Sequence, residues 1–214
     1  MNASGNPHLA MPPVLAGAGL ARAHTVAVLV HGRNQSEQVM LDVVRRLALP
    51  GVAYVLPIAA GLSWYPNRYF DPASAVEPHL QPALAAVTAA IEDATAEAGA
   101  GARVVLGGFS QGACLLAELV ARRAPEQLAG VAILTGSLIG RAEERRTPAR
   151  VDGLPMFFSC ARHDEWVALA DAEASAEAFR RAGAQVAFAP LEDREHVISD
   201  RAVAGLRALL AGSD

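Results

Sequence analysis

The chain has 214 residues, of which 52% are apolar and 19% charged, and its formal net charge is −4. This composition predicts a globular protein with a sizeable core, and it excludes a disordered chain. The small negative net charge does not indicate a basic surface that would bind nucleic acid. Two cysteines are too few for a disulfide framework, and the longest apolar runs fall far short of the ~20 residues that span a membrane.

Residues 1–23 form an N-terminal segment. Small apolar residues at 9–21 resemble a secretory signal, but no basic residue precedes them and two consecutive prolines would break its helical part. We therefore expect this segment to stay in the mature protein, with a short edge strand near Val14. The protein is then expected to be cytoplasmic, with Cys114 and Cys160 as free thiols.

Short β-branched runs alternate with longer segments rich in Ala, Leu, Glu and Arg along the rest of the chain. Hydrophobic periodicity and helix-end signals predict strands at 26–30, 52–56, 103–106, 131–134, 155–159 and 185–189. They predict helices between and after these strands, at 36–47, 78–98, 111–123, 167–182 and 199–210. Long loops are expected at 58–76 and 136–153. The charged run from Arg141 to Arg146 is interpreted as a solvated surface.

Six strands that alternate with helices predict an α/β fold, with a doubly wound, mostly parallel sheet and helices on both faces. Neither a repeat nor a linker divides the sequence, so we expect a single domain over 1–214. In such a sheet, functional groups lie on the loops at the carboxyl ends of the strands. We therefore expect catalytic or binding residues on the loops that follow the predicted strands.

A candidate nucleophile follows the predicted strand at 103–106. The segment Gly108-Phe-Ser110-Gln-Gly112 matches the G-x-S-x-G elbow and is followed by a predicted helix. A serine on such a sharp strand-to-helix turn projects its hydroxyl above the sheet. Side chains two positions away on either side would collide with neighbouring backbone, which explains both glycines.

A serine hydroxyl near neutral pH needs a base and a carboxylate that orients the base. In this type of fold the chain order is serine, acid, histidine. His196 lies in the loop after the last predicted strand, and Asp164 follows the preceding strand, so we expect Ser110, Asp164 and His196 to be catalytic. The competing residues, which we consider weaker, are Glu165, Asp171 and Asp193 for the acid and His163 for the base.

The oxyanion of an acyl-transfer intermediate needs preorganised donors. One is expected to be the backbone N–H of Gln111, at the start of the helix that follows Ser110. The second is expected to be the backbone N–H of Arg33, in the loop after the first central strand. His31 precedes Ser110 in the chain, so its expected role is structural, as a hydrogen-bonding residue of this loop.

These motifs together resemble one known family. His31-Gly32, Gly108-Phe-Ser-Gln-Gly-Ala113, Asp164-x-x-Val167 and His196-x-Ile-Ser199 are similar to blocks of the phospholipase/carboxylesterase family, over roughly residues 24–212. The resemblance implies an α/β-hydrolase fold without a cap domain, the triad and the two donors named above. One position departs, because the family has a glycine where this chain has Asn34, a residue type that tolerates positive φ.

A substrate pocket is expected beside the nucleophile. Four of the 11 aromatic residues fall within seven positions of the predicted loop at 58–76, and the family has an aromatic-rich loop here. We expect an open, shallow pocket with walls formed by Trp64, Tyr65, Tyr69, Phe70, Leu138 and Trp166. Packing within the loop itself is the alternative role of these aromatics. The Arg33 side chain is expected at the mouth, where it would screen substrates.

The predicted function is hydrolysis of carboxylic esters of short to medium acyl chains by a serine carboxylesterase. The alternatives are an acyl thioesterase or lysophospholipase that acts on longer chains, and a non-catalytic binding protein of the same fold. No cofactor and no metal are expected, and the expected partner is a small-molecule ester, without nucleic acid or a membrane span. A homodimer is compatible with the sequence.

Overall fold

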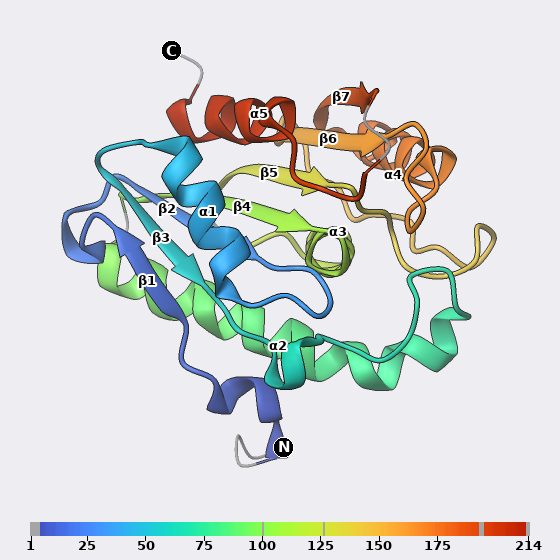
Figure 1. The fold of residues 1–214 in the computed structure, drawn as a ribbon, viewed down its shortest axis with the longest axis horizontal. Helices are drawn as coiled ribbons and strands as arrows, with labels where there is room; N and C mark the ends of the chain where they lie inside the picture. Colours follow the sequence, from blue (N-terminus) through green and yellow to red (C-terminus); the bar gives the residue numbers. More distant parts are fainter. Residues whose placement is uncertain (1–4, 100, 126, 193–194, 213–214) are drawn as a thin grey trace.

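The computed structural model describes residues 5–99, 101–125, 127–192 and 195–212. Seven strands form one sheet in the order β1-β3-β2-β4-β5-β6-β7 (Figure 1). Neighbouring strands are parallel, except that β1 runs antiparallel to β3 at one edge. The strands are β1 (Val14–Gly17), β2 (Thr25–Val30), β3 (Val52–Leu56), β4 (Arg103–Phe109), β5 (Leu128–Leu134), β6 (Pro155–Ala161) and β7 (Gln185–Leu191).

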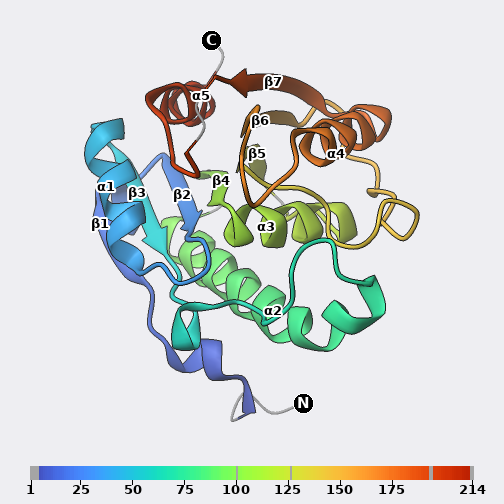
Figure 2. The same cartoon turned by 45° about the vertical axis from the view of Figure 1, so that its right-hand side comes forward.

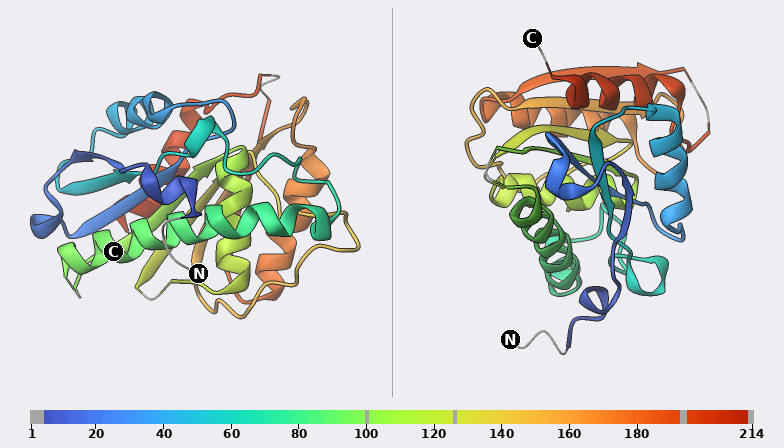
Figure 3. Two further views of the ribbon diagram at one scale, coloured as in Figure 1. Left: turned by 90° about the horizontal axis from the view of Figure 1, so that it is seen from below. Right: turned by 90° about the vertical axis from the view of Figure 1, so that its left-hand side faces the viewer.

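Helices cover both faces of the sheet (Figure 2). One face carries α1 (Glu37–Leu47) and α5 (Asp200–Ala211), and the other carries α2 (Ala73–Ala98), α3 (Gln111–Arg122) and α4 (Leu169–Arg181). Short 3-10 helices at Pro7–Ala10 and Leu20–Arg22 lie against α2 (Figure 3), and a third covers Ala60–Leu62. In the described part of the chain, no helix has the length and apolarity needed to cross a membrane.

Strand β2 lies inside the sheet, between β3 and β4, and is buried on both sides. Val28 and Val30 pack into the core under α2 and α3, whereas Ala27 and Leu29 pack into the core under α1 and α5. A strand that is covered on both faces needs apolar residues at every position, which explains the continuous apolar run here. The doubly wound sheet predicted from the alternation of elements is thus confirmed.

Strand β4 ends three residues later than predicted and β5 begins three residues earlier, but the largest boundary error concerns α2. Helix α2 begins at Ala73, five residues earlier than expected, so that Pro78 and Pro82 lie inside the helix. Proline removes a backbone donor from a helix interior, but Pro78 is on the exposed side, where water can solvate the carbonyl that loses its partner. The buried side chains of Val76 and Leu80 hold the first turns against the core.

Candidate active site

The turn between β4 and α3 has the strained geometry of a nucleophile elbow. Ser110 has φ 54° and ψ −119°, a conformation that side-chain-bearing residues rarely adopt. A Cβ on Gly108 would lie 2.6 Å from the carbonyl oxygen of Gly112. The predicted steric need for glycine two positions before Ser110 is therefore confirmed, and the turn presents the Ser110 hydroxyl at the carboxyl end of the sheet.

A continuous chain of hydrogen bonds joins three loops at this edge. Ser110 Oγ lies 2.8 Å from His196 Nε2, and His196 Nδ1 lies 2.8 Å from Asp164 Oδ2 and 3.0 Å from Oδ1. The carboxylate can only accept, so it assigns the imidazole proton to Nδ1 and leaves Nε2 free to accept the proton of Ser110. This arrangement is able to convert the serine hydroxyl into a nucleophile.

Asp164 is fixed by its own loop. Its Oδ1 atom accepts hydrogen bonds from the backbone N–H groups of Trp166 (2.9 Å) and Val167 (2.8 Å), and its side chain is only 1% exposed. Burial raises the pKa of this carboxyl, but the hydrogen bonds from His196 and the two backbone groups outweigh burial and lower the pKa below its ordinary value. Asp164 is therefore held as the ionised acceptor that the imidazole requires.

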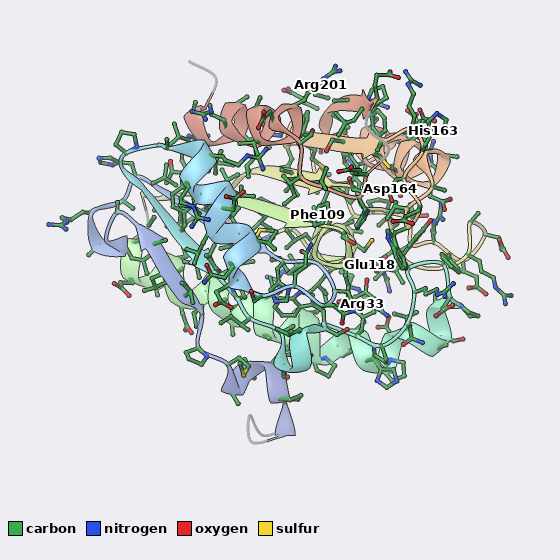
Figure 4. All side chains as sticks on the ribbon, viewed as in Figure 1. Arg33, Phe109, Glu118, His163, Asp164 and Arg201 are labelled. Atoms are coloured by element: carbon green, nitrogen blue, oxygen red, sulfur yellow. The ribbon has the colours of Figure 1, made fainter. Side chains whose placement is uncertain are left out.

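The competing residues do not join this chain of hydrogen bonds in the described part of the structure. His163 and Glu165 are exposed on the loop after β6, next to Asp164, and Figure 4 labels His163 and Asp164 on that loop. Asp171 lies in α4 and binds other groups. Asp193 lies outside the described residues.

Two backbone N–H groups are available beside Ser110. Gln111 is the first residue of α3, so its N–H has no partner within the helix, and Arg33 lies on the loop after β2. Among the hydrogen bonds between described residues, none is donated by either N–H. Both residues line the cavity that contains Ser110, so their N–H groups are the candidate donors of an oxyanion hole.

The first loop is organised by His31, as predicted. Its Nδ1 lies 2.7 Å from the carbonyl oxygen of Gly32, and its Nε2 accepts from the N–H of Ala59 at 3.1 Å. Burial lowers the pKa of His31, so the ring remains neutral and satisfies one donor and one acceptor. Asn34 takes the left-handed conformation at φ 56°, so it provides the turn for which the resembled family uses glycine.

A cavity of about 550 Å³ opens at Ser110 and His196. Four of the predicted wall residues line it, namely Tyr65, Tyr69, Phe70 and Trp166. Phe70 is 43% exposed and Trp166 is 61% exposed, so two of the apolar residues of the cavity are open to solvent. The indole ring of Trp166 lies 6.5 Å from the imidazole of His196, measured between ring centroids.

The prediction was wrong for two residues, Trp64 and Leu138. Neither is among the residues that line this cavity, and each side chain is only 1% exposed. The indole N–H of Trp64 donates to the carbonyl oxygen of His31 at 2.9 Å, so the indole is turned into the core behind the loop. Leu138 borders a separate cavity beside α4. Apolar character alone does not distinguish a residue of the core from a residue of the cavity wall.

The sequence did not reveal that two polar side chains hold the aromatic loop. The Arg33 guanidinium donates to the carbonyl oxygens of Tyr65 (3.1 Å), Pro66 (3.0 Å) and Asn67. The Gln111 amide accepts from the N–H of Trp64 at 2.9 Å and donates to the carbonyl of Tyr65 at 2.7 Å. The partners of both side chains are backbone N–H and carbonyl groups, which leave no signal in a sequence. Because the Arg33 guanidinium is bound to the loop carbonyls, it is not free to screen substrates at the mouth of the cavity, as the sequence had suggested.

The Cys114 thiol also lines the cavity, but it is not activated. Burial raises the pKa of Cys114 to about 12, so this thiol of the cavity lining stays protonated and is a poor nucleophile. Within the described residues, His, Cys, Asp and Glu side chains form no cluster suited to a metal ion.

The chain is similar to known proteins over most of its length. The phospholipase/carboxylesterase family model matches residues 17–212. A phospholipase/carboxylesterase from Dyadobacter fermentans is 26% identical, with 92% of this chain and 94% of that chain covered and a TM-score of 0.82.

Two further solved structures share the fold. Esterase PE8 is 19% identical, with 94% and 98% of the two chains covered and a TM-score of 0.77. A carboxylesterase from Mesorhizobium loti is 22% identical, with 95% and 96% covered and a TM-score of 0.74. No protein among the curated sequences matches the chain significantly.

Proposed function

The chain belongs to the phospholipase/carboxylesterase family, and from this premise we propose that it is a serine carboxylesterase that hydrolyses esters of short to medium acyl chains. Its α/β-hydrolase fold has no cap domain over the sheet in the described part of the chain. The observation that carries the proposal is the unbroken hydrogen-bonded chain from Ser110 Oγ through His196 to Asp164. Non-catalytic use of the fold would not require this alignment.

In the proposed first step, His196 Nε2 takes the proton of Ser110 as Oγ attacks the acyl carbonyl carbon. The carbonyl oxygen becomes an oxyanion, which accepts hydrogen bonds from the N–H groups of Arg33 and Gln111. The intermediate then expels the alcohol, which leaves with the proton from His196, and the acyl group remains esterified to Ser110. Asp164 stabilises the imidazolium throughout.

In the second step, water attacks the acyl-enzyme. His196 removes a proton from this water, and the same two N–H groups receive the second oxyanion. The intermediate collapses, Ser110 regains its proton from His196, and the carboxylic acid leaves. The groups required for both steps lie on the loops after β2, β4, β6 and β7, so the sheet holds them in fixed relative positions.

The exposed apolar residues at the cavity also favour a second candidate function. The exposed Phe70 and Trp166 side chains continue the apolar surface of the cavity outwards. A longer acyl chain could lie along this surface, as in an acyl thioesterase or a lysophospholipase. Initial rates on p-nitrophenyl esters from acetate to palmitate, and on matched thioesters, distinguish the two, since our proposal expects a maximum at short to medium esters.

The catalytic assignment is tested with Ser110→Ala. We expect this variant to lose turnover of p-nitrophenyl butyrate and to lose labelling by a fluorophosphonate probe, while Ser74→Ala retains both. Ser74 is a suitable control because it is an exposed serine on α2. Full activity of Ser110→Ala would contradict the assignment, and an unlabelled, inactive parent protein would favour a non-catalytic binding role.

A further inference from the structure

The side chain of Tyr69 connects the aromatic loop to the opposite side of the active-site cavity. It lines the cavity, yet its hydroxyl is bound by α4 and by the loop before α4. The hydroxyl donates to Asp171 Oδ2 at 2.8 Å and accepts from the N–H of Ala168 at 3.2 Å. Burial raises the pKa of Tyr69 to about 12, so the phenol stays neutral and retains the proton that it donates.

The contacts of Asp171 lead back to Tyr69 in a closed circuit. Asp171 Oδ1 pairs with Arg145 Nη2 at 2.7 Å, and Arg145 Nε donates to the carbonyl oxygen of Gly140 at 3.2 Å. The N–H of Gly140 then donates to the carbonyl oxygen of Tyr69 at 2.7 Å. We call these four residues the Tyr69 circuit. It holds the backbone and the hydroxyl of Tyr69 at the same time.

The circuit is largely shielded from water. The Arg145 side chain is 10% exposed and the Asp171 side chain is 27% exposed, so the pair lies in a lower dielectric than a surface pair. Removal of one partner would leave a charge that is shielded and unpaired, which is costly. The sequence interpretation of the run from Arg141 to Arg146 as solvated surface was therefore wrong for Arg145.

Tyr69 also reaches the loop that orients the catalytic acid. The Ala168 N–H that binds the phenol follows directly after Val167, whose own N–H donates to Asp164 Oδ1 at 2.8 Å. The phenol thus joins two loops that border the same cavity. A shift of its ring would change the shape of the cavity and the support of the acid loop together.

We propose that Asp171 and Arg145 are positioning residues that fix Tyr69 as a rigid wall and so determine which ester groups the cavity admits. Neither side chain lines the cavity, so both act through Tyr69 and not by contact with substrate. The proposal rests on the proposed esterase function. A fixed wall excludes branched and bulky acyl groups, whereas a released phenol would allow them to enter.

The test compares Asp171→Ala and Arg145→Ala with Tyr69→Phe, which keeps the aromatic ring and removes only the hydroxyl. The matched control is Glu177→Ala, which removes exposed ion pairs with Arg180 and Arg181 on the same helix. KM and kcat are measured on p-nitrophenyl acetate, butyrate, pivalate and benzoate. All three test variants should raise the preference for bulky over small esters by about tenfold, the range of a one-methylene change in a pocket.

We expect the effect to fall on KM more than on kcat, and Glu177→Ala to keep the parent profile. Identical substrate profiles for the parent and the test variants would overturn the proposal. If an alanine variant fails to fold, Tyr69→Phe alone decides, because it retains the half-buried ring.

A second measurement separates failure of this proposal from failure of the esterase assignment. The Tm values of Tyr69→Phe, Arg145→Ala and the double variant form a cycle that needs no turnover. A closed circuit predicts that the double variant loses less than the sum of the two single losses. Strict additivity would overturn the circuit even in an active enzyme, while an inactive and unlabelled parent would overturn only the esterase function.

Discussion

Gly112 lies so close to Val30 that a Cβ on the glycine would be 2.3 Å from the Val30 carbonyl oxygen, and 2.5 Å from that of His31. The helix after the nucleophile therefore presses against the strand that leads to the proposed oxyanion loop. Real Cβ atoms do not tolerate such distances from backbone, so the whole elbow would have to move.

Gly112→Ala should accordingly displace Ser110 from His196. We expect a fall in kcat/KM of about 100-fold, typical of a misplacement near 1 Å, with a loss of about 1–3 kcal/mol in the free energy of unfolding from overpacking. Steady-state kinetics and urea unfolding measure both. Gly101→Ala is the control, because a Cβ there would meet nothing within 4 Å. Parent-like kinetics for Gly112→Ala would contradict the close packing.

Asp164→Asn preserves the size of the acid while it removes the charge that selects the imidazole tautomer. We expect kcat on p-nitrophenyl butyrate to fall by about 10⁴-fold, as in serine hydrolases that lose this carboxylate. The far-UV circular dichroism spectrum should not change. Glu165→Gln, on the adjacent exposed residue, serves as the control. A kcat within tenfold of the parent would mean that another group orients His196.

Arg33→Met keeps an unbranched apolar side chain and the backbone N–H of this position but removes the guanidinium that binds three loop carbonyls. We expect KM to rise by about tenfold as the pocket wall loosens, and limited proteolysis to cut within 65–70 more rapidly. Arg201→Met is the control, because Arg201 is exposed on α5 and is labelled far from Arg33 in Figure 4. If proteolysis is unchanged, the clamp does not restrain the loop.

Glu77 supplies a pH-dependent contribution to stability. The bidentate hydrogen bonds from Arg122, at 2.7 and 2.6 Å, lower the pKa of Glu77 to about 2. A depressed carboxylate pKa stabilises the fold above the ordinary value, and this gain is lost as pH falls from about 4.5 towards 2. The Glu77 side chain is 40% exposed, so solvent reduces the gain to about 1 kcal/mol.

Glu77→Gln should therefore lower the free energy of unfolding at pH 7 and make little difference near pH 2. Urea unfolding at both pH values checks this, with Glu92→Gln as an exposed control on the same helix. A deficit of equal size at both pH values would show that the pair contributes by packing and not by charge.

The elements that follow local rules were predictable from the sequence. The strand-to-helix context of Ser110, and the positions of Asp164 and His196 after consecutive strands, place all three at one edge of a parallel sheet. Parallel topology brings these loops together whatever their separation in the chain, so motif order alone was sufficient to predict the grouping.

Features that depend on the partner of a side chain were not predictable. The aromatic run contains both Trp64, which is anchored on the His31 carbonyl, and Tyr69, which forms a cavity wall. The two residues differ in the acceptor that each side chain binds, namely the His31 carbonyl for Trp64 and the Asp171 carboxylate for Tyr69. The sequence does not show which acceptor lies within reach of each side chain. Arg145 likewise appeared to be one charge in a solvated run, because its partner Asp171 is 26 positions away on α4.

The two tryptophans of the chain lie in opposite environments. The indole of Trp64 is 1% exposed in the core, whereas that of Trp166 is 61% exposed beside His196. The emission of Trp64 should therefore lie at short wavelength, while Trp166 should emit at long wavelength and be accessible to iodide. Occupancy of the cavity can thus be followed by the intrinsic fluorescence of the unlabelled protein, with Trp64 as an internal reference for the folded state.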